Sequence, residues 1–342
     1  MSKIFLTGAT GYIGGEALYA ISKKHPDFSI SALVRDTTKN QRIKAAFSNV
    51  RIVNGELDDF ELLKREAANA DIVVHTADAS DHVIAAQAIA AGLAEGHTAS
   101  KPGYWLHVGG TGILTFRDSD RNVYGEYDDK IYNDWEGVDE LTHLPDHAFH
   151  RNVDKIVLEA GTKNADRVKT ALICPPTIYG PGRGPINQKS RQVYALASMT
   201  LQIKKAPLLG AGKSIWNNVH IQDLGQLFVL LTEAAVAGRQ DKGLWGAEGY
   251  YFVENGEHVW GDVSRSIAQI AAKEGYIPEP SVGEVDIETC EKFAGYQAMS
   301  WGMNSRGKAK RAVKLLDWKP VAPSLEEELP GIVNMEYNDL KK

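Results

Sequence analysis

Three glycines at three-residue spacing stand near the start of the chain, in Thr7-Gly-Ala-Thr-Gly-Tyr-Ile-Gly14. Gly8 permits a tight turn, Gly11 lets the backbone approach a pyrophosphate, and Gly14 lets a helix pack closely on a sheet. At such a turn the N–H groups and dipole of the helix face the anion. A plain glycine turn is the alternative. The spacing favours a dinucleotide site, with contacts expected from Gly8, Thr10, Gly11, Tyr12, Ile13 and Gly14.

The end of the expected second strand selects between two cofactors. An acidic residue there accepts a hydrogen bond from the ribose 2′-hydroxyl of NAD, whereas an arginine binds the 2′-phosphate of NADP. Arg35 comes first in Ala32-Leu-Val-Arg-Asp36, so NADP(H) is favoured and NAD(H) is the second choice. In the alternative, Arg35 is a solvated charge and Asp36 faces the ribose.

Strands and helices alternate through the first half of the chain. Short apolar runs predict strands over 3–7, 29–34, 51–53, 71–75 and 104–108, and apolar residues three and four apart predict helices over 12–24, 60–69 and 83–94. Alternation with short connections implies parallel strands joined by right-handed crossovers. We therefore expect an α/β fold built on a Rossmann-type doubly wound parallel sheet.

The second half of the chain is less regular. No period is clear over 117–150, which indicates an insertion or an active-site loop. Further on, we expect strands over 168–174 and 250–253 and helices near 152–162, 190–204, 224–237, 259–273 and 325–334. The expected organisation is a dinucleotide-binding domain over 1–180 and a smaller substrate-binding lobe over 181–342, with some segments returning to the first domain.

Composition excludes several classes of protein. The 342 residues include 44 acidic and 38 basic ones, a net charge of -6 that argues against a nucleic-acid partner. The longest apolar stretch, 83–94, is shorter than the ~20 residues that cross a bilayer, so no membrane partner is expected. Two cysteines cannot build a disulfide framework, which favours the reducing cytoplasm. The histidines lack metal-ligand spacing, and no metal is predicted.

Further motifs follow the glycine loop in a recognisable order. They are Gly55-Glu-Leu-Asp-Asp59, His75-Thr-Ala77, Cys174-Pro-Pro-Thr-Ile-Tyr-Gly-Pro-Gly182, Val219-His-Ile-Gln-Asp223 and Leu316-Asp-Trp-Lys-Pro320. In these motifs the chain resembles the extended or atypical branch of the short-chain dehydrogenase/reductase superfamily, which includes sugar-nucleotide epimerases and NmrA-like proteins. The resemblance implies that Glu56 and Leu57 lie at the adenine and that Ala77 and Pro175 line the cofactor cleft.

The resemblance also implies a catalytic pattern, from which this chain departs. Relatives that transfer hydride use a Ser or Thr after the fifth strand and a Tyr-x-x-x-Lys on the next helix. Thr111 is the corresponding hydroxyl, and Lys155 would hold the nicotinamide ribose, but Arg151 stands at the Tyr position. An arginine, with a pKa above ~12, cannot exchange a proton at neutral pH. The proton would then come from His150, another tyrosine such as Tyr179, or bound water. Arg151 would bind a substrate carboxylate or phosphate, or would be a surface charge at a helix start.

Other charged residues are candidates for substrate contact. Asp78 follows the fourth strand near the expected nicotinamide, and Arg183, Lys189 and Arg191 surround the proline- and glycine-rich loop. Solvated charges are the alternative for all four. Asp223 precedes an apolar helix and fits an N-cap as well as a site residue.

The sequence favours one function among three. The first hypothesis is an NADP(H)-dependent oxidoreductase acting on a small organic carbonyl, alcohol or activated alkene, with a non-standard proton donor. The second is an isomerase, epimerase or lyase on the same scaffold. The third is a dinucleotide-sensing regulatory protein of the NmrA type. A small-molecule substrate is the expected partner, and a homodimer is left open.

Overall fold

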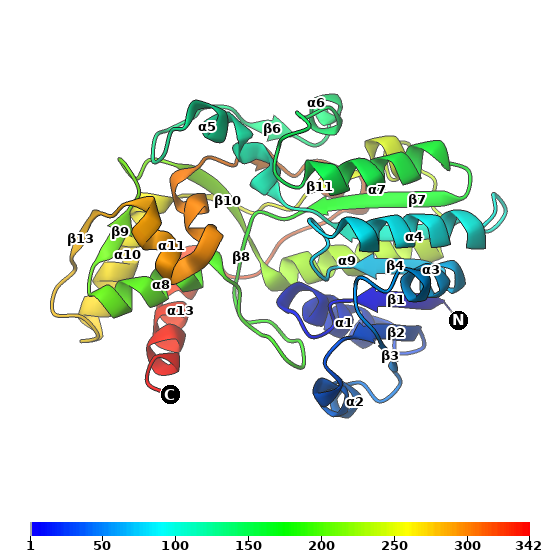
Figure 1. Ribbon diagram of the computed structural model, residues 1–342, viewed down its shortest axis with the longest axis horizontal. Helices are drawn as coiled ribbons and strands as arrows, with labels where there is room; N and C mark the ends of the chain where they lie inside the picture. The colour runs from blue at the N-terminus through cyan, green and yellow to red at the C-terminus, as the bar shows by residue number, and fades with distance from the viewer. Residues whose placement is uncertain (1) are drawn as a thin grey trace.

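A seven-stranded parallel sheet forms the centre of the computed structural model, which describes residues 2–342 (Figure 1). Its strand order, β11-β7-β5-β4-β1-β2-β3, is that of a doubly wound fold with the switch between β1 and β4. The strands are β1 (Lys3–Thr7), β2 (Ser29–Val34), β3 (Arg51–Asn54), β4 (Ile72–His75), β5 (Gly103–Val108), β7 (Val168–Cys174) and β11 (Tyr250–Phe252). The predicted α/β fold is confirmed.

Helices cover both faces of this sheet. On one face, α3 (Phe60–Asn69) packs against α4 (Val83–Gly96), which packs against α7 (Arg151–Lys163). On the other face, α1 (Tyr12–Lys24) packs against α9 (Ile221–Val236). Every residue of β4 and β5 is buried, because a parallel strand covered on both faces has no solvent side.

The C-terminal half of the chain builds a second apolar core beside the first. Its helices are α8 (Gln192–Ile203), α10 (Trp260–Lys273), α11 (Ile287–Ala294) and α13 (Leu325–Asp339), and short strands β9 (Ala206–Leu208) and β13 (Val282–Glu284) pair beside them. Figure 1 shows this lobe to the left of the sheet. Three later segments, α9, β11 and α12 (Arg311–Leu316), instead bury their apolar side chains in the first core.

Short strands connect the two lobes. β8 (Thr177–Tyr179) pairs in parallel with β10 (Ile215–His220), which pairs with β12 (Glu257–Val259). The chain leaves the central sheet at the end of β7 and enters this small sheet through β8. Residues just after β7 therefore lie between the lobes.

The segment over 117–150 contains more structure than the sequence indicates. It holds α5 (Phe116–Arg121), β6 (Tyr132–Asn133) and α6 (Val138–Thr142), and β6 pairs with β14 (Gly307–Lys308). Its acidic residues are largely structural. Asp134 is fully buried and accepts backbone N–H groups of Phe252, Lys310 and Arg311. These long-range contacts hold the segment in place where local periodicity does not.

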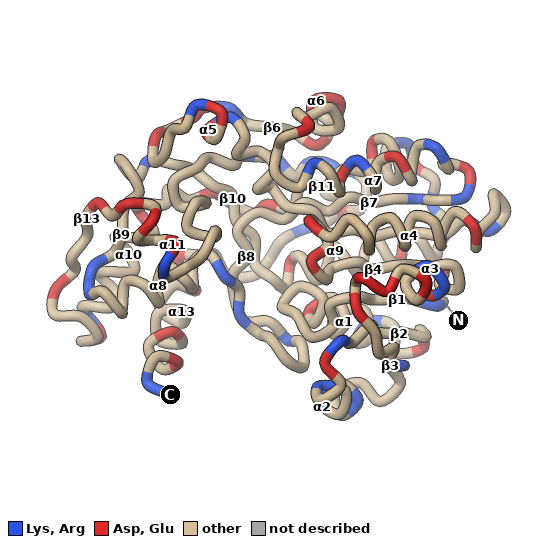
Figure 2. The backbone as a smooth tube through the Cα atoms, viewed as in Figure 1, with Lys and Arg blue, Asp and Glu red and all other residues tan. Residues whose placement is uncertain are grey.

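Charged residues of both signs lie on several peripheral helices, such as α3, α5 and α7, while the strands of the central sheet are mostly uncharged (Figure 2). Within residues 2–342, no helix combines the length and apolar character required to cross a bilayer. The described residues also contain no group of three His, Cys, Asp or Glu side chains arranged to hold a metal ion.

Candidate functional site

A cavity of about 1050 Å³ opens between the lobes at the carboxyl ends of the central strands. This is the edge at which doubly wound sheets bind ligands, and the volume is large enough for a dinucleotide and a small molecule. The sequence-predicted cofactor residues that line it are Gly8, Thr10, Gly11, Tyr12, Ile13, Gly14, Arg35, Glu56, Leu57, Ala77 and Pro175. Lys155 does not line it.

The glycine loop lines part of this cavity. Gly8 has a φ of +83°, a conformation that L side chains rarely adopt. A Cβ added at Gly8 or Gly14 would collide with Thr76 Oγ1, whereas a Cβ at Gly11 would meet only Gly8 O, at 3.2 Å. Gly14 is thus required for packing, and Gly11 leaves space on the cavity side. The glycine loop leads into the N-terminus of α1, and a helix N-terminus suits a phosphate group.

The two residues after β2 have different surroundings. Arg35 is exposed, lines the cavity and forms no ion pair within the described part of the chain. Asp36 does not line the cavity, because it caps the turn that follows: its Oδ1 accepts the N–H of Thr38 at 3.0 Å, and its Oδ2 lies 3.3 Å from Lys39 Nζ. The cation, and not the carboxylate, is available at this end of the site.

Thr111 also lines the cavity, directly after β5. Its backbone is held on both sides: the N–H donates to Pro175 O at 3.1 Å, and the C=O accepts the hydroxyl of Ser305 at 2.7 Å. Its own hydroxyl is buried and has no hydrogen-bond partner among residues 2–342. A buried hydroxyl without a hydrogen-bond partner is unfavourable in the free protein.

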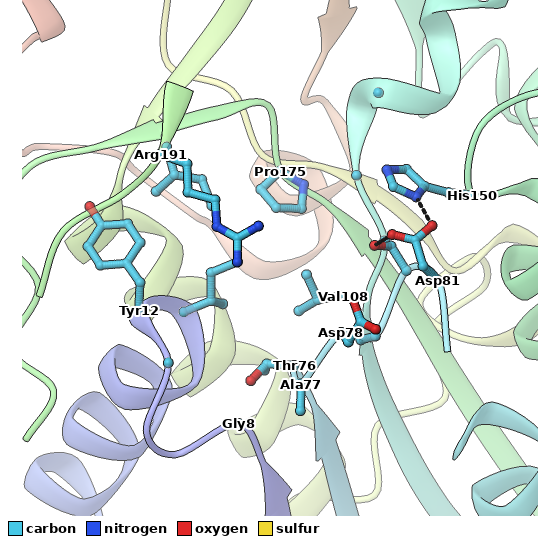
Figure 3. Close-up of a pocket in the computed structure, with 18 of the residues that line it drawn as sticks. Gly8, Tyr12, Thr76, Ala77, Asp78, Asp81, Val108, His150, Pro175 and Arg191 are labelled. Atoms are coloured by element: carbon cyan, nitrogen blue, oxygen red, sulfur yellow. Dashed lines mark hydrogen bonds and ion pairs between the residues drawn. The ribbon is translucent and has the colours of Figure 1, made fainter. Parts of the chain in front are cut away.

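An imidazole faces the same space. His150 precedes α7 and lines the cavity, with its Nδ1 2.7 Å from Asp81 Oδ1, as drawn in Figure 3. The other carboxylate oxygen, Oδ2, accepts the Ser80 hydroxyl at 3.0 Å. Burial alone would raise the pKa of Asp81, but the hydrogen bond and charge of His150 outweigh that effect and hold the pKa below its ordinary value.

Backbone strain flanks this pair. His150 has a φ of 70° and Asp78 a φ of 46°, both in the left-handed region that non-glycine residues seldom occupy. The carbonyl of Asp78 accepts the N–H groups of Asp81, at 3.1 Å, and His82, at 3.0 Å, which closes a tight turn. This turn places Asp81 opposite His150. Strain of this kind persists only where surrounding contacts enforce it.

The structure corrects the expected placement of three catalytic candidates. Lys155 extends away from the cavity to an exposed ion pair with Asp146, at 2.9 Å. Arg151 is buried, and its Nη2 donates to Thr142 O at 2.7 Å. Tyr179 lies in the core of the second lobe, where its hydroxyl donates to Pro323 O at 2.9 Å and burial raises its pKa.

For Arg151 and Lys155, the physical reason is the direction in which each side chain leaves α7. Each residue advances about 100° around a helix, so positions displaced by one point in different directions. His150, at the start of α7, lines the cavity, whereas Arg151 and Lys155 do not. A Cβ added to the cavity residue Gly109 would lie 3.1 Å from Asp154 Oδ1. Burial raises the pKa of Asp154 to about 7.

The remaining charged candidates divide between structural and cavity positions. Arg183 is held by Glu16, with Nε 2.9 Å from Oε1, and does not line the cavity. Lys189 lines it but binds Glu336 and Asp339, at 2.8 and 2.9 Å. Arg191 points into the cavity and has no carboxylate partner among the described residues (Figure 3).

Asp78 is a cavity residue, whereas Asp223 is structural. Asp223 accepts the backbone N–H of Val321 at 2.9 Å and is not the N-cap of α9. That position belongs to His220, whose Nδ1 accepts the N–H of Gln222 at 3.1 Å.

Part of the cavity wall is apolar. It is lined by aromatic and sulfur-containing side chains from the first lobe, β10 and the turn η4 (Gly295–Gly302) with the residue after it: Phe149, Trp216, Tyr296, Met299 and Met303. The rings of Phe149 and Tyr296 meet edge to face, 6.4 Å apart, across the two lobes. Both rings are about half exposed, at 47% and 58%.

Sequence reasoning missed this apolar wall and the contact between Asp81 and His150. The wall comes from segments that are distant in the chain, so no local signal could have identified it. For the imidazole there was a signal, because His150-x-x-x-Asp154 has the same spacing as the expected pair and precedes it by one residue.

Comparison with known proteins agrees with this architecture. The NmrA-like family profile matches residues 1–96. The protein named oxidase ucsJ, from Acremonium sp., is 42% identical over 348 aligned residues, which cover 99% of this chain and 98% of the relative. A dTDP-glucose 4,6-dehydratase of Mycobacterium tuberculosis is 23% identical over 65% of this chain and 66% of its own length.

Among solved structures, dTDP-glucose 4,6-dehydratase from Bacillus anthracis, in complex with NAD, has a TM-score of 0.68 at 18% identity, covering 99% of this chain and 97% of that one. UDP-glucose 4-epimerase from Thermotoga maritima, with UDP-glucose, has a TM-score of 0.65 at 15% identity and covers 99% of this chain and 100% of its own. At these identities the likeness establishes the fold.

Proposed function

Because the chain belongs to the family of the Acremonium oxidase ucsJ, within the extended short-chain dehydrogenase/reductase superfamily, we propose that it is an NADP(H)-dependent oxidoreductase. Its substrate is a small organic carbonyl, alcohol or activated alkene, and its proton donor is not a tyrosine. One observation carries this proposal: a single cavity is lined by the glycine loop, the free Arg35, Thr111 and an apolar wall.

The residues present fit a nicotinamide dinucleotide. The space beside Gly11 and the N-terminus of α1 suit the diphosphate, and Glu56 and Leu57 line the cavity near the expected adenine. When bound, such a cofactor supplies the hydride acceptor or donor of the reaction. Thr111, at the end of β5, would bind the substrate oxygen through its hydroxyl.

The surroundings of Arg35 and Asp36 support NADP(H) over NAD(H). A guanidinium without a partner binds a phosphate through charge-assisted hydrogen bonds. Asp36 would have to give up the N–H of Thr38 and the ammonium of Lys39 to reach a ribose hydroxyl. The named NAD complex of the dehydratase is consistent with dinucleotide binding on this fold, and the choice between the two cofactors rests on Arg35.

The apolar wall of the cavity favours an organic substrate of modest size. Phe149, Trp216 and Met303 offer apolar surface, which favours hydrocarbon and aromatic groups through the hydrophobic effect. The name of the ucsJ relative, an oxidase, agrees with redox chemistry.

The proposal is tested by titrating the protein with NADPH and NADH and then following reduced-nicotinamide absorbance with a panel of aldehydes, ketones, quinones and alcohols. We expect tighter binding of NADPH and turnover of at least one apolar carbonyl or alcohol. Binding without turnover of any redox pair would replace the proposal with a sensor. Conversion of a substrate with no net change in the cofactor would indicate an isomerase or lyase.

A further inference from the structure

We propose that His150 is the acid–base catalyst of this site and that Asp81 is its positioning residue. The inference rests on the proposed function, since it assigns the proton transfer that accompanies hydride transfer. It replaces the tyrosine and lysine of the family pattern with an imidazole and a carboxylate from two different loops.

The hydrogen bond to Asp81 fixes the state of the imidazole. A carboxylate can only accept, so the Nδ1 atom, 2.7 Å from Asp81 Oδ1, carries the proton. In neutral His150 the Nε2 atom is then the free base. Asp81 is itself fixed through Ser80, so the imidazole is held in both tautomer and orientation.

The Nε2 atom faces the glycine turn after β5. A Cβ added at Gly112 would lie 3.2 Å from Nε2, and one at Gly110 would lie 3.4 Å from it. Both glycines line the cavity, so the absence of side chains there leaves the base accessible to a ligand. Thr111 stands between these glycines. Thr111 and His150 thus line the same cavity, and the Thr111 hydroxyl has no hydrogen-bond partner among residues 2–342.

The backbone is built to hold this arrangement. His150 keeps a left-handed conformation at the start of α7, although an ordinary helix start would avoid it. The ring of Phe149 packs on the imidazole, with centroids 3.7 Å apart. These contacts leave only 10% of the His150 side chain exposed, on the cavity side.

The imidazole of His150 can transfer the proton in both oxidation and reduction. For alcohol oxidation, Nε2 takes the hydroxyl proton as the C–O double bond forms and the hydride on the same carbon passes to the oxidised nicotinamide. The two electrons that the substrate loses would leave with that hydride to a bound NADP⁺, and the imidazolium then releases its proton to water. For reduction, the imidazolium donates the proton to the oxygen as the carbonyl carbon receives hydride.

Three titratable groups lie near His150. Asp81, on the loop after β4, stabilises the imidazolium directly. Asp154, one turn along α7, stabilises it when ionised, and His107, in β5, would oppose it only if it were charged. Burial keeps the pKa of His107 well below its ordinary value, so that residue stays neutral.

The test compares His150→Gln and Asp81→Asn with His147→Gln and Asp120→Asn. The second pair is a matched control, because His147 Nε2 and Asp120 Oδ1 lie 2.9 Å apart outside the cavity. Assays use the NADP⁺-dependent oxidation of 4-nitrobenzyl alcohol and the reduction of 4-nitrobenzaldehyde. General acid–base catalysis contributes about 10²- to 10⁴-fold, so kcat should fall at least 100-fold in His150→Gln. The KM and the NADPH affinity should change little, and the control pair should match the wild type.

The pH profile and NMR separate catalysis from mere packing. In oxidation the base must be neutral, so the wild-type rate falls on the acid side. That limb should disappear in His150→Gln. In Asp81→Asn it should move to lower pH, because the lost negative charge destabilises the imidazolium. Imidazole should partly restore activity to His150→Ala. Nitrogen-15 NMR of the histidines should show Nδ1–H on His150 in the wild type, and its low-field proton signal should weaken in Asp81→Asn.

Two outcomes would overturn the assignment. One is retention of the acid limb and of kcat in His150→Gln, and the other is an Nε2–H tautomer in the wild type. Failure of the proposed function is distinguishable from these. In that case the wild type turns over neither probe nor any panel compound, while NMR still reports the tautomer and whether the Nε2 signal moves when NADP⁺ and the alcohol are added.

Discussion

At the scale of single residues, the proposed preference for NADP(H) depends on which of two neighbouring side chains is free. Asp36 is engaged with Thr38 and Lys39, whereas Arg35 faces the cavity with no carboxylate partner among residues 2–342. Arg35→Ala should therefore weaken NADPH more than NADH. Loss of a charge-assisted contact costs ~1.5 to 3 kcal/mol, or about 10- to 100-fold in Kd.

Fluorescence titration with both cofactors measures this difference. Arg42→Ala is the control, because Arg42 donates to Pro185 O at 3.1 Å and does not line the cavity. Equal losses for NADPH and NADH in Arg35→Ala would remove the 2′-phosphate assignment.

At the scale of elements, the phase of α7 separates two catalytic patterns. Lys155 belongs to the expected pattern, but its ammonium is in an exposed ion pair with Asp146. Exposed pairs contribute about 0–1 kcal/mol to stability. Lys155→Ala should keep NADPH affinity and kcat within about twofold of the wild type, as should Lys163→Ala, which removes another exposed ion pair of the same helix. A loss of about 100-fold in kcat for Lys155→Ala alone would restore the ribose-binding role.

The glycine loop offers a second contrast within one element. Gly11→Val should abolish dinucleotide binding and leave the fold intact, because its side chain would enter the space of the diphosphate. Gly14→Val should instead impair folding, since its Cβ would collide with the backbone of Gly8. Circular dichroism and dinucleotide titration of both variants measure the two effects. Wild-type dinucleotide affinity in a folded Gly11→Val variant would be incompatible with diphosphate binding at this loop.

At the scale of the whole molecule, buried histidines link stability to pH. Burial, with a smaller effect from the charge of His82, lowers the pKa of His75 to about 3, and burial lowers that of His258 to about 3. In the unfolded chain both titrate near ~6.5. Between about pH 3 and about pH 6.5, the unfolded state binds more protons than the folded state. Their stability contribution is therefore complete above about pH 6.5 and falls as the pH drops toward about 3.

The melting temperature should consequently decrease from about pH 7 to about pH 5. Asp154 has the opposite sign, because its raised pKa of about 7 favours folding at low pH and costs stability as the pH rises through that value. Asp154→Asn removes this opposing contribution, so its melting temperature should fall more steeply on acidification than that of the wild type. A melting temperature of both proteins that does not vary with pH would contradict this account.

The sequence by itself determined the parts of the protein that depend on local pattern. Apolar periodicity predicted the central strands and most helices, and the glycine spacing predicted where the first loop meets the sheet. Arg35 could be identified as a candidate cofactor contact because its place at a strand end follows from the length of that strand. The carboxyl ends of parallel strands meet at one edge, so these residues had to converge.

Only the tertiary structure decided which side chains meet across the cavity. Asp81 and His150 are 69 residues apart, and their contact depends on a strained turn and on the direction in which α7 begins. A shift of one residue on a helix changes the direction of a side chain by about 100°, so spacing alone could not separate His150 from Arg151. The apolar wall likewise joins Phe149, Trp216 and Tyr296 from both lobes. Packing between distant segments sets these positions, and no local pattern in the chain encodes it.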